Sequence, residues 1–408
     1  METIIHEISQ KIINETKENL INTLANHKDI SEFILNTEKI LDDIGVQIVQ
    51  KALETVDSLV KQDNLRKEKW TVQRKADRKT IATIFGEVNY KRTYYKNKKT
   101  GEYKYLSDQR LGIDIHDRLD SSLKAKLVDE AIESSYRKSG QIAVDSIDLT
   151  NQTVMNTIRE LGDIPNDSVK ITEKKKVVKT LYIEADEDHV ALQSGKNIEP
   201  KLVYVHEGKK AVNKDRYRLQ NVRYFSGVYS HSADLWIEVA NYLEEAYDME
   251  KIEKIYLSGD GAKWIKNGVG WIKGSIFVLD RFHLSKYIKI ATAHLPYTTP
   301  IMWHYINKLD KKSVLDLFRV IIEETKLQTK INAIKDSRRY IMNQWEGIKN
   351  QYNKDYIGCS AEGHISHILA DRLSSRPRAW SKTGVDQMSR LRVFKANGGD
   401  VYDLIINK

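Results

Sequence analysis

Apolar residues recur at steps of three and four along residues 1–65, a spacing that is typical of amphipathic helices. One stripe includes Ile8 and Ile12, and a second, longer stripe includes Ile34 and Leu41. We therefore expect two or three helices in this region. Packing of their apolar faces on one another within the chain is the first interpretation, and self-association of the chain is the alternative.

The pattern changes to short β-rich stretches between residues 66 and 110. Residues 80–85 and 87–95 are rich in β-branched and aromatic residues and are joined at Gly86, and a turn precedes residues 103–105. These features predict a small antiparallel β unit in which basic and aromatic residues alternate.

Helical periodicity returns between residues 111 and 165. A helix is indicated over 119–137, followed by a short helical piece and by a helix over 150–161 with Thr150 as its expected N-cap. This is the outline of a helix-turn-helix, although helix pairs of this shape also occur in proteins that do not bind DNA. The side chains that would face a DNA groove are Asn151, Gln152, Asn156 and Arg159.

From about residue 175, buried-strand patterns alternate with helices. Strands are indicated over 177–191, 201–206, 222–229, 255–257 and 275–279, with helices over 233–247 and from residue 282 onward. The order of three strands, a helix, a strand, a short helical piece, a strand and a helix is that of the ribonuclease H-like (RNase H-like) fold. We predict an α/β RNase H-like mixed-sheet core in residues 175–294 and 356–408, with an all-helical insertion over 295–355. The mainly helical region with its small β unit and helix-turn-helix precedes this core.

Composition narrows the class of protein. A chain of 408 residues, 40% of them hydrophobic, is long enough for about two to four globular domains. Cys359 is the single cysteine, which excludes a disulfide framework and a cysteine-rich zinc site and fits a reducing compartment. No apolar run approaches the roughly 20 residues of a membrane span, so we expect a cytoplasmic protein that does not contact membranes.

The net charge of +9 is concentrated in one segment. Residues 61–104 carry 14 lysine and arginine residues against 5 acidic ones, so the rest of the chain is about neutral. A basic zone beside a neutral body is typical of a polyanion-binding module, and a solvated lysine-rich surface is the alternative. A second basic–aromatic strip spans residues 374–380, where Arg376 and Arg378 are expected either to contact phosphates or to remain plain surface charge.

Acidic residues follow the predicted strands of the second half. Alternation along the strand at 177–191 places Asp186 and Asp188 on the face opposite its apolar residues. Asp260 closely follows the strand at 255–257 and Asp280 directly follows the strand at 275–279, at the rim where open α/β sheets bind ligands and metals. The alternative is that these aspartates are turn formers, because Asp-Gly is an ordinary turn pair.

Glu362 is the third acidic position, at the start of a late helix for which Ser360 is the expected N-cap; its alternative role is to favour the helix dipole. In a sheet of this order Asp186, Asp260 and Glu362 converge, and converging carboxylates need divalent cations. Hard oxygen ligands favour Mg²⁺ or Mn²⁺, and two ions about 4 Å apart would act on a phosphodiester. Asp188 competes with Asp186 as the first ligand.

Five segments of the second half share a pattern of acidic, glycine and histidine residues. They are Ala185-Asp-Glu-Asp-His189, Ser258-Gly-Asp-Gly261, Leu279-Asp-Arg-Phe-His283, Ser360-Ala-Glu-Gly363 and Lys395-Ala-Asn-Gly-Gly-Asp400. Together with Phe85-Gly-Glu-Val88 and the Ser134-Ser-Tyr136 region, they resemble a bacterial insertion-sequence transposase family long catalogued as an uncharacterised protein family. The resemblance covers essentially the whole chain.

The resemblance implies an RNase H-like DDE transposase that nicks element ends and joins them to target DNA with Mg²⁺, as a homo-oligomer on DNA and associated with the nucleoid. It implies Asp186, Asp260 and Glu362 as the catalytic and metal-binding triad, with Asp280 and His283 as an accessory motif. His283 itself is expected to be bonded to a neighbour rather than to a metal.

Three alternatives stay open. The chain is a DNA-binding regulator with an inactive sheet domain, or a structure-specific nuclease that hydrolyses DNA without joining strands. Members of the resembled family usually extend past Asp400 with a further tail, whereas this sequence ends at Lys408, so a C-terminally shortened copy is the third alternative.

Overall fold

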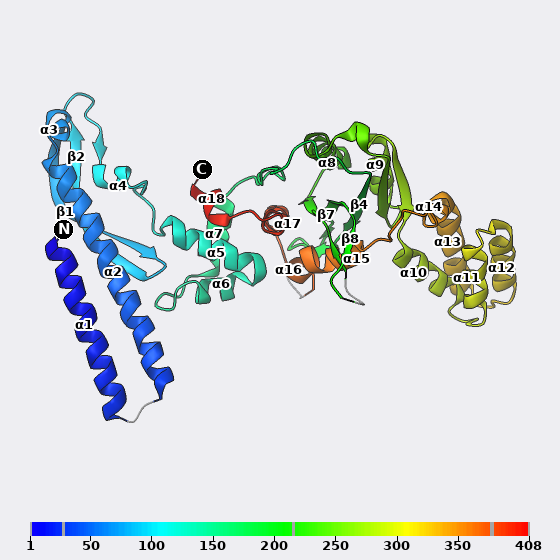
Figure 1. The fold of residues 1–408 in the computed structure, drawn as a ribbon, viewed down its shortest axis with the longest axis horizontal. Helices are drawn as coiled ribbons and strands as arrows, with labels where there is room; N and C mark the ends of the chain where they lie inside the picture. The colour runs from blue at the N-terminus through cyan, green and yellow to red at the C-terminus, as the bar shows by residue number, and fades with distance from the viewer. Residues whose placement is uncertain (1, 27–28, 214–216, 376–378, 407–408) are drawn as a thin grey trace. The chain divides into compact units, whose positions relative to one another are not determined.

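The computed structural model describes residues 2–26, 29–213, 217–375 and 379–406. The chain forms two compact units, one of Met1–Leu161 with Asp400–Lys408 and the other of Gly162–Gly399. Figure 1 labels the α-helices and some of the strands of both units. The short C-terminal piece belongs to the first unit, whereas the sequence analysis assigned it to the last part of the core.

Two long helices open the first unit. α1 spans Glu2–Ala25 and α2 spans Ile30–Gln62, and they run side by side as a hairpin (Figure 1). The Asn19 side chain of α1 donates to the backbone carbonyl of Phe33 in α2 over 3.0 Å. Two amphipathic helices therefore form where the apolar periodicity predicted them.

The second half of α2 packs against a β-hairpin. α3 (Asn64–Lys69) leads into β1 (Trp70–Thr83), which pairs antiparallel with β2 (Gly86–Asn97), and β3 (Tyr103–Lys104) adds to β2. Leu53 of α2 packs with Ile81 of β1 and Val88 of β2. The antiparallel β unit is present, and β1 begins well before the strand that the sequence indicated.

Short helices complete the first unit. They are α4 (Leu106–Arg110), α5 (Ser121–Glu133), α6 (Tyr136–Ile142), α7 (Asn151–Glu160) and α18 (Val401–Ile406). The Thr150 hydroxyl caps α7 by accepting from the Thr153 N–H over 3.2 Å, which confirms the predicted N-cap. Gly140 in α6 is required because a Cβ there would collide with the Leu149 carbonyl oxygen.

A five-stranded mixed sheet forms the centre of the second unit. Its strands are β4 (Thr180–Glu187), β7 (Lys201–His206), β10 (Arg223–Gly227), β11 (Lys254–Gly259) and β12 (Ser275–Leu279). The order across the sheet is β10-β7-β4-β11-β12, in which β7 runs antiparallel to both β10 and β4, and β4, β11 and β12 run parallel to one another. The unit is therefore a mixed α/β structure.

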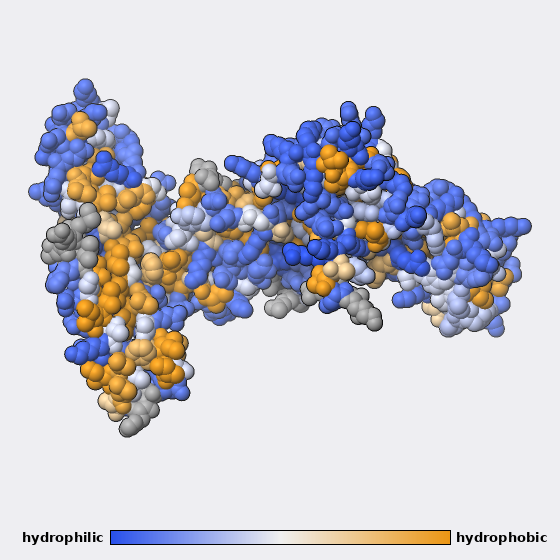
Figure 2. All heavy atoms as spheres, in the orientation of Figure 1, coloured by the Kyte–Doolittle hydropathy of each residue, from blue (hydrophilic) through white to orange (hydrophobic). Residues whose placement is uncertain are grey.

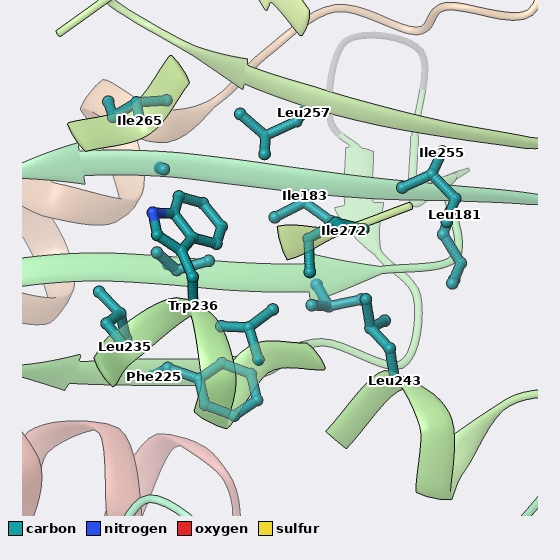
Figure 3. Close-up of a cluster of buried hydrophobic side chains, with 14 of the residues drawn as sticks. Leu181, Ile183, Phe225, Leu235, Trp236, Leu243, Ile255, Leu257, Ile265 and Ile272 are labelled. Atoms are coloured by element: carbon teal, nitrogen blue, oxygen red, sulfur yellow. The ribbon is translucent and has the colours of Figure 1, made fainter. Parts of the chain in front are cut away.

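Helices cover one face of this sheet. They are α8 (Ser232–Ala246), the 3₁₀ turn η1 (Met249–Lys251) and α9 (Lys263–Trp271). The next helix, α10 (Arg281–Thr292), packs instead with the helices that follow it. Ile183 of β4 packs with Trp236 of α8 and Ile265 of α9 in the apolar cluster of Figure 3. Because side chains alternate along a strand, Glu184 and Asp186 of β4 point to the opposite face.

A helical segment follows α10. It consists of α11 (Thr298–Asn307), α12 (Lys311–Glu323), α13 (Gln328–Asn343) and α14 (Trp345–Asn350). Residues 295–355 are all described, and none of them lies in a strand. Asn350 and Gln351 donate to the carbonyls of Phe277 and Leu279, each over 2.8 Å, so this segment covers the edge strand β12.

The remaining elements are short pieces around the sheet and one longer helix. They are β5 (Val190–Ala191), β6 (Asn197–Ile198), β8 (Lys209–Ala211), β9 (Tyr217–Leu219), α15 (Ala361–Ile365), the π-helix η2 (Ser366–Ala370), α16 (Asp371–Leu373) and α17 (Lys382–Ala396). Among the helices of the described ranges, none combines the length and the apolar character that crossing a membrane requires.

Candidate active site

Three aspartates lie in a row at the C-terminal ends of the parallel strands. The register of β11 with β4, continued by two residues, places Asp260 opposite Asp186, and its register with β12 places Asp260 opposite Asp280. Neighbouring strands lie about 4.8 Å apart. The structure therefore brings these three sequence-predicted residues to one edge of the sheet.

Asp186 lies in an environment that disfavours its ionised form. Its side chain is buried, and one carboxylate oxygen accepts from the Glu187 N–H over 2.9 Å. Burial raises the pKa of Asp186 to about 7; the charges of Asp260 and Glu362 add to this effect, while the Glu187 N–H and His283 oppose it. An acid in this position is stable either with a proton or beside a positive charge.

The loop of Asp260 is held by the helical segment. Its carboxylate accepts from the Ala262 N–H over 2.7 Å, and the Tyr340 hydroxyl donates to its backbone carbonyl. Gln344 donates to the Gly261 carbonyl over 3.1 Å. Gly261 has a φ of +87°, a backbone conformation that favours glycine, and a Cβ there would push the Gln344 amide away from this carbonyl.

Asp280 caps α10 and holds His283. One oxygen of this buried carboxylate accepts from the Phe282 N–H over 3.0 Å, and the other lies 3.1 Å from His283 Nδ1. Burial opposes protonation of His283, but the Asp280 hydrogen bond and the charges of Asp186 and Asp260 raise its pKa overall. His283 thus stands as a basic group beside the acidic row, bonded to a neighbour as expected.

Glu362 is exposed in the first turn of α15, within electrostatic range of Asp186. The π-helix η2 follows α15 directly, and π-helical turns occur frequently at functional sites. The prediction that Ser360 caps this helix is wrong. Its hydroxyl lies 3.1 Å from a Glu184 carboxylate oxygen and makes no capping hydrogen bond.

Glu184 is a buried carboxylate that the sequence analysis did not select. One oxygen lies 3.0 Å from His206 Nε2, and the other accepts from the Tyr204 hydroxyl, the Cys359 thiol and both the N–H and the hydroxyl of Ser360. Burial alone would raise the pKa of Glu184, but the hydrogen bonds from His206, Tyr204 and Ser360 lower it to about 2. Glu184 is therefore ionised at neutral pH.

The Glu184 network connects two parts of the candidate site. Glu184 precedes Asp186 by two residues on the same face of β4, and Ser360 precedes Glu362 by two residues at the start of α15. The bond from Ser360 to Glu184 therefore fixes where α15, and with it Glu362, lies relative to the aspartate row. The alternating pattern of β4 shows that Glu184 lies on the polar face of the strand. It does not show the hydrogen-bond partners of Glu184, because these lie far away along the chain.

Asp188 lies just beyond the end of β4 and has a different environment. One oxygen accepts from the Ser374 hydroxyl over 2.8 Å and from the His189 N–H over 2.9 Å, while the other is buried and has no hydrogen-bond partner among the described residues. Burial raises its pKa. Asp188 is thus bonded to the segment after α16, whereas Asp186 is coupled electrostatically to Asp260 and Glu362.

In the described part of the chain, no three histidine, cysteine, aspartate or glutamate side chains are close enough together to hold one metal ion as they stand. The residues nevertheless fit a hard cation. Carboxylate oxygens are the donors that Mg²⁺ and Mn²⁺ prefer. A bound cation would also relieve the cost of ionising the buried Asp186.

The candidate DNA-binding residues of α7 are displayed on one side of the helix. Asn151, Gln152, Asn156 and Arg159 are all exposed, and Val154 and Ile158 are buried. The outer face of α7 is thus polar, as predicted. Arg376 and Arg378 lie outside the described residues.

The basic β unit also presents charge and aromatic rings together. The Arg74 guanidinium lies 4.6 Å from the centre of the Tyr94 ring, and Tyr94 stacks on the exposed Tyr103 at 5.5 Å. Residue Arg74 is itself exposed. Such a surface suits the backbone of a nucleic acid.

Comparison with known proteins places the chain in a family. The profile of the uncharacterised protein family UPF0236 matches residues 23–407. A UPF0236 protein of Caldanaerobacter subterraneus subsp. tengcongensis is 45% identical over 402 residues, which cover 97% of this chain and 85% of the relative, and its name joins eleven designations from that organism. Another from the same organism is 46% identical over 377 residues, covering 92% of this chain and 80% of the relative. A UPF0236 protein of Streptococcus gallolyticus, named for the vanSb 3′ region, is 27% identical over 395 residues, covering 92% and 85%. The chain therefore belongs to the UPF0236 family.

Proposed function

We propose that this chain is a DDE transposase with an RNase H-like core, which cleaves DNA at the ends of an insertion sequence and joins them to target DNA with Mg²⁺ or Mn²⁺. The observation that carries the proposal is that Asp186 and Asp260 lie side by side at the ends of adjacent parallel strands, with Glu362 in electrostatic range of Asp186. The strand order β10-β7-β4-β11-β12 supports it, because an RNase H-like core requires this order with its second strand antiparallel.

Three residues are assigned to the metal. Asp186, Asp260 and Glu362 would hold one or two divalent cations, which when bound supply the Lewis acidity that activates a water or a 3′-hydroxyl toward a phosphodiester. We favour Asp186 over Asp188 as the first ligand, since Asp188 is bonded to Ser374.

The remaining residues of the site position these three. The hydrogen bonds from Ser360 to Glu184 fix the position of α15. Glu362 would therefore reach a bound cation by rotating its side chain, without movement of the helix. Asp280 orients His283, and the raised pKa of His283 favours its protonated form beside the row and beside an incoming phosphate.

One relative has a name that joins eleven designations from a single organism, and this supports the proposal that the chain is encoded by a mobile element. An insertion sequence multiplies in its host, so many designations for one protein are the expected result. Neither the regulator nor the nuclease alternative explains why one organism would carry so many designations for one protein.

The proposal includes the partners. Duplex DNA would contact the polar face of α7, where Arg159 is exposed, and the basic surface of β1 and β2. We further propose a homo-oligomer on DNA and association with the nucleoid.

Nicking and strand-transfer assays with the full chain test the proposal. The substrate is a duplex carrying the ends of the DNA segment that encodes this chain, with a target plasmid and Mg²⁺. Asp260→Asn and Glu362→Gln should abolish both nicking and joining, whereas Asp336→Asn and Glu346→Gln, which change exposed acids of α13 and α14, should not.

Three other outcomes of these assays would contradict the proposal. Full activity of both Asp260→Asn and Glu362→Gln would make the proposed triad wrong. Nicking without joining would indicate a nuclease. Sequence-specific binding without nicking, unchanged in both variants, would indicate a regulator.

A further inference from the structure

The hairpin of α1 and α2 exposes a long apolar surface. Figure 2 shows it as a band along both helices. Among the side chains described between residues 6 and 43, the buried ones are Asn19 and Thr23, and both are polar. Helices of this length owe most of their stability to packing of an apolar face. This part of the hairpin therefore needs a partner that covers it.

The exposed apolar residues follow the spacing of a coiled coil. On α2 they include Ile34, Leu41 and Ile48, seven residues apart and 46–58% exposed. On α1, Ile13 and Leu20 are also seven residues apart and are 56% and 48% exposed. Leu24 and Ile30, at 67% and 66%, extend the two stripes toward the tip of the hairpin. A seven-residue repeat is the seam by which helices associate with other helices.

Charge decides the class of the partner. Residues 2–62 contain eleven acidic residues and six lysines, so the hairpin is net acidic. A nucleic acid or an anionic membrane would be repelled by this surface. The partner is therefore a protein with an apolar helical face.

The size of the surface fits a second copy of the hairpin. If a fully exposed leucine or isoleucine presents roughly 180 Å², the seven stripe residues expose roughly 700 Å², which lies within the ~600–1,000 Å² that each partner of a stable complex buries. A two-fold axis would bring the same two stripes of each chain together, so every stripe residue would find an equivalent apolar neighbour.

We propose that two copies of this chain associate hairpin to hairpin, so that α1 and α2 of each chain form a four-helix bundle. The expected homo-oligomer would thus be a dimer whose interface is the apolar surface of the α1–α2 hairpin. The inference does not depend on the carboxylates or on DNA, because the hairpin belongs to the first unit and the acidic row to the second.

The molar mass of the full chain in solution tests this inference. Light scattering and sedimentation over about 1–50 µM, without DNA or metal, should give twice the chain mass of 47.2 kDa. The double variant Ile34→Glu/Leu41→Glu should be monomeric, because an unpaired buried carboxylate should weaken association at least ~100-fold. Val320→Glu is the matched control on α12, where Val320 is 43% exposed, and should remain dimeric. Circular dichroism verifies that the variants stay helical.

Two results would overturn the inference. One is a wild-type chain that is monomeric throughout this range, and the other is an Ile34→Glu/Leu41→Glu chain that dimerises like the wild type. Hydrogen exchange of the α1 amides gives an independent measure. It should slow as the wild-type concentration rises, whereas strong protection at every concentration would mean that the chain's own remainder covers the face. Asp260→Asn should dimerise normally, which separates this inference from the proposed catalysis.

Discussion

Replacing Glu184 by glutamine measures how much the buried carboxylate stabilises the second unit. Glutamine keeps the size of the side chain but presents an NH₂ group and no charge to donors that include His206 Nε2 and the Ser360 N–H. A buried donor left facing another donor costs more than a lost hydrogen bond. We expect Glu184→Gln to weaken the attachment of α15 to the sheet.

The pKa of Glu184 gives the size of the effect. It is about 2 in the folded chain against an ordinary value of 4.5. Each unit corresponds to about 1.4 kcal/mol, so ionised Glu184 contributes about 3 kcal/mol to the free energy of unfolding. Because the folded pKa is the lower one, this contribution is present above pH 4.5 and is lost as the pH falls toward 2.

Urea unfolding followed by tryptophan fluorescence reports on the correct unit, since six of the seven tryptophans lie in Gly162–Gly399. Glu184→Gln should be about 3 kcal/mol less stable than the wild type at pH 7, with a smaller difference near pH 3. The control Glu250→Gln changes an exposed glutamate and should stay within about 0.5 kcal/mol. A loss under about 1 kcal/mol at pH 7, or one that does not vary with pH, would refute the role given to this carboxylate.

Asp186→Asn should stabilise the metal-free chain at pH 8 by up to about 4 kcal/mol and little at pH 4. The folded pKa of Asp186 is about 7 and its ordinary value is 3.8, so the stability lost through this carboxylate grows as the pH rises from 3.8 to 7 and is complete at about pH 8. Thermal unfolding at both pH values measures this, and equal shifts at both would contradict it. Gly261→Ala should cost about 1 kcal/mol more than Gly274→Ala, since both glycines have positive φ but only a Cβ at Gly261 would push the Gln344 amide away and break its hydrogen bond to the Gly261 carbonyl; equal losses in denaturant unfolding would contradict this displacement. Arg159→Ala should lower DNA affinity and reduce the salt slope of log K by about 1, measured by fluorescence anisotropy at several salt concentrations; an unchanged slope would remove Arg159 from the DNA contact.

The buried strands of the second unit were the most predictable part of the fold. The predicted bounds 201–206 and 275–279 agree with β7 and β12, because these runs are apolar and end at polar or turn-forming residues. β1 was predicted too short. Its first half is mostly exposed and contains irregular pairing around Arg74, so no apolar alternation marks it.

The helical hairpin shows a second limit of the sequence pattern. The periodicity around Ile34 and Leu41 predicted helices correctly, but it could not say what covers their apolar faces. Packing within the chain was the first interpretation, and these residues are 58% and 56% exposed. An apolar stripe in the sequence indicates that something covers it, but it does not identify what. The structure shows that α1 leaves the stripe with Ile34 and Leu41 exposed.

The candidate site was predictable where it follows from strand ends and not where it depends on remote contacts. Asp186 and Asp260 were placed near each other because parallel strands end at the same edge. The network of Glu184 joins β4 to His206 and to Ser360, which are 22 and 176 residues away, and no local pattern encodes those contacts. For the same reason Ser360 was taken for a helix cap.

A crystal of the full chain with a cleaved element end, soaked in Mn²⁺, tests the central claim most directly. The claim predicts anomalous density for at least one Mn²⁺ between Asp186 and Asp260, with a Glu362 oxygen within about 2.2 Å of a metal. Mn²⁺ bound elsewhere, or a Glu362 carboxylate beyond coordination distance of every metal while DNA is present, would contradict it.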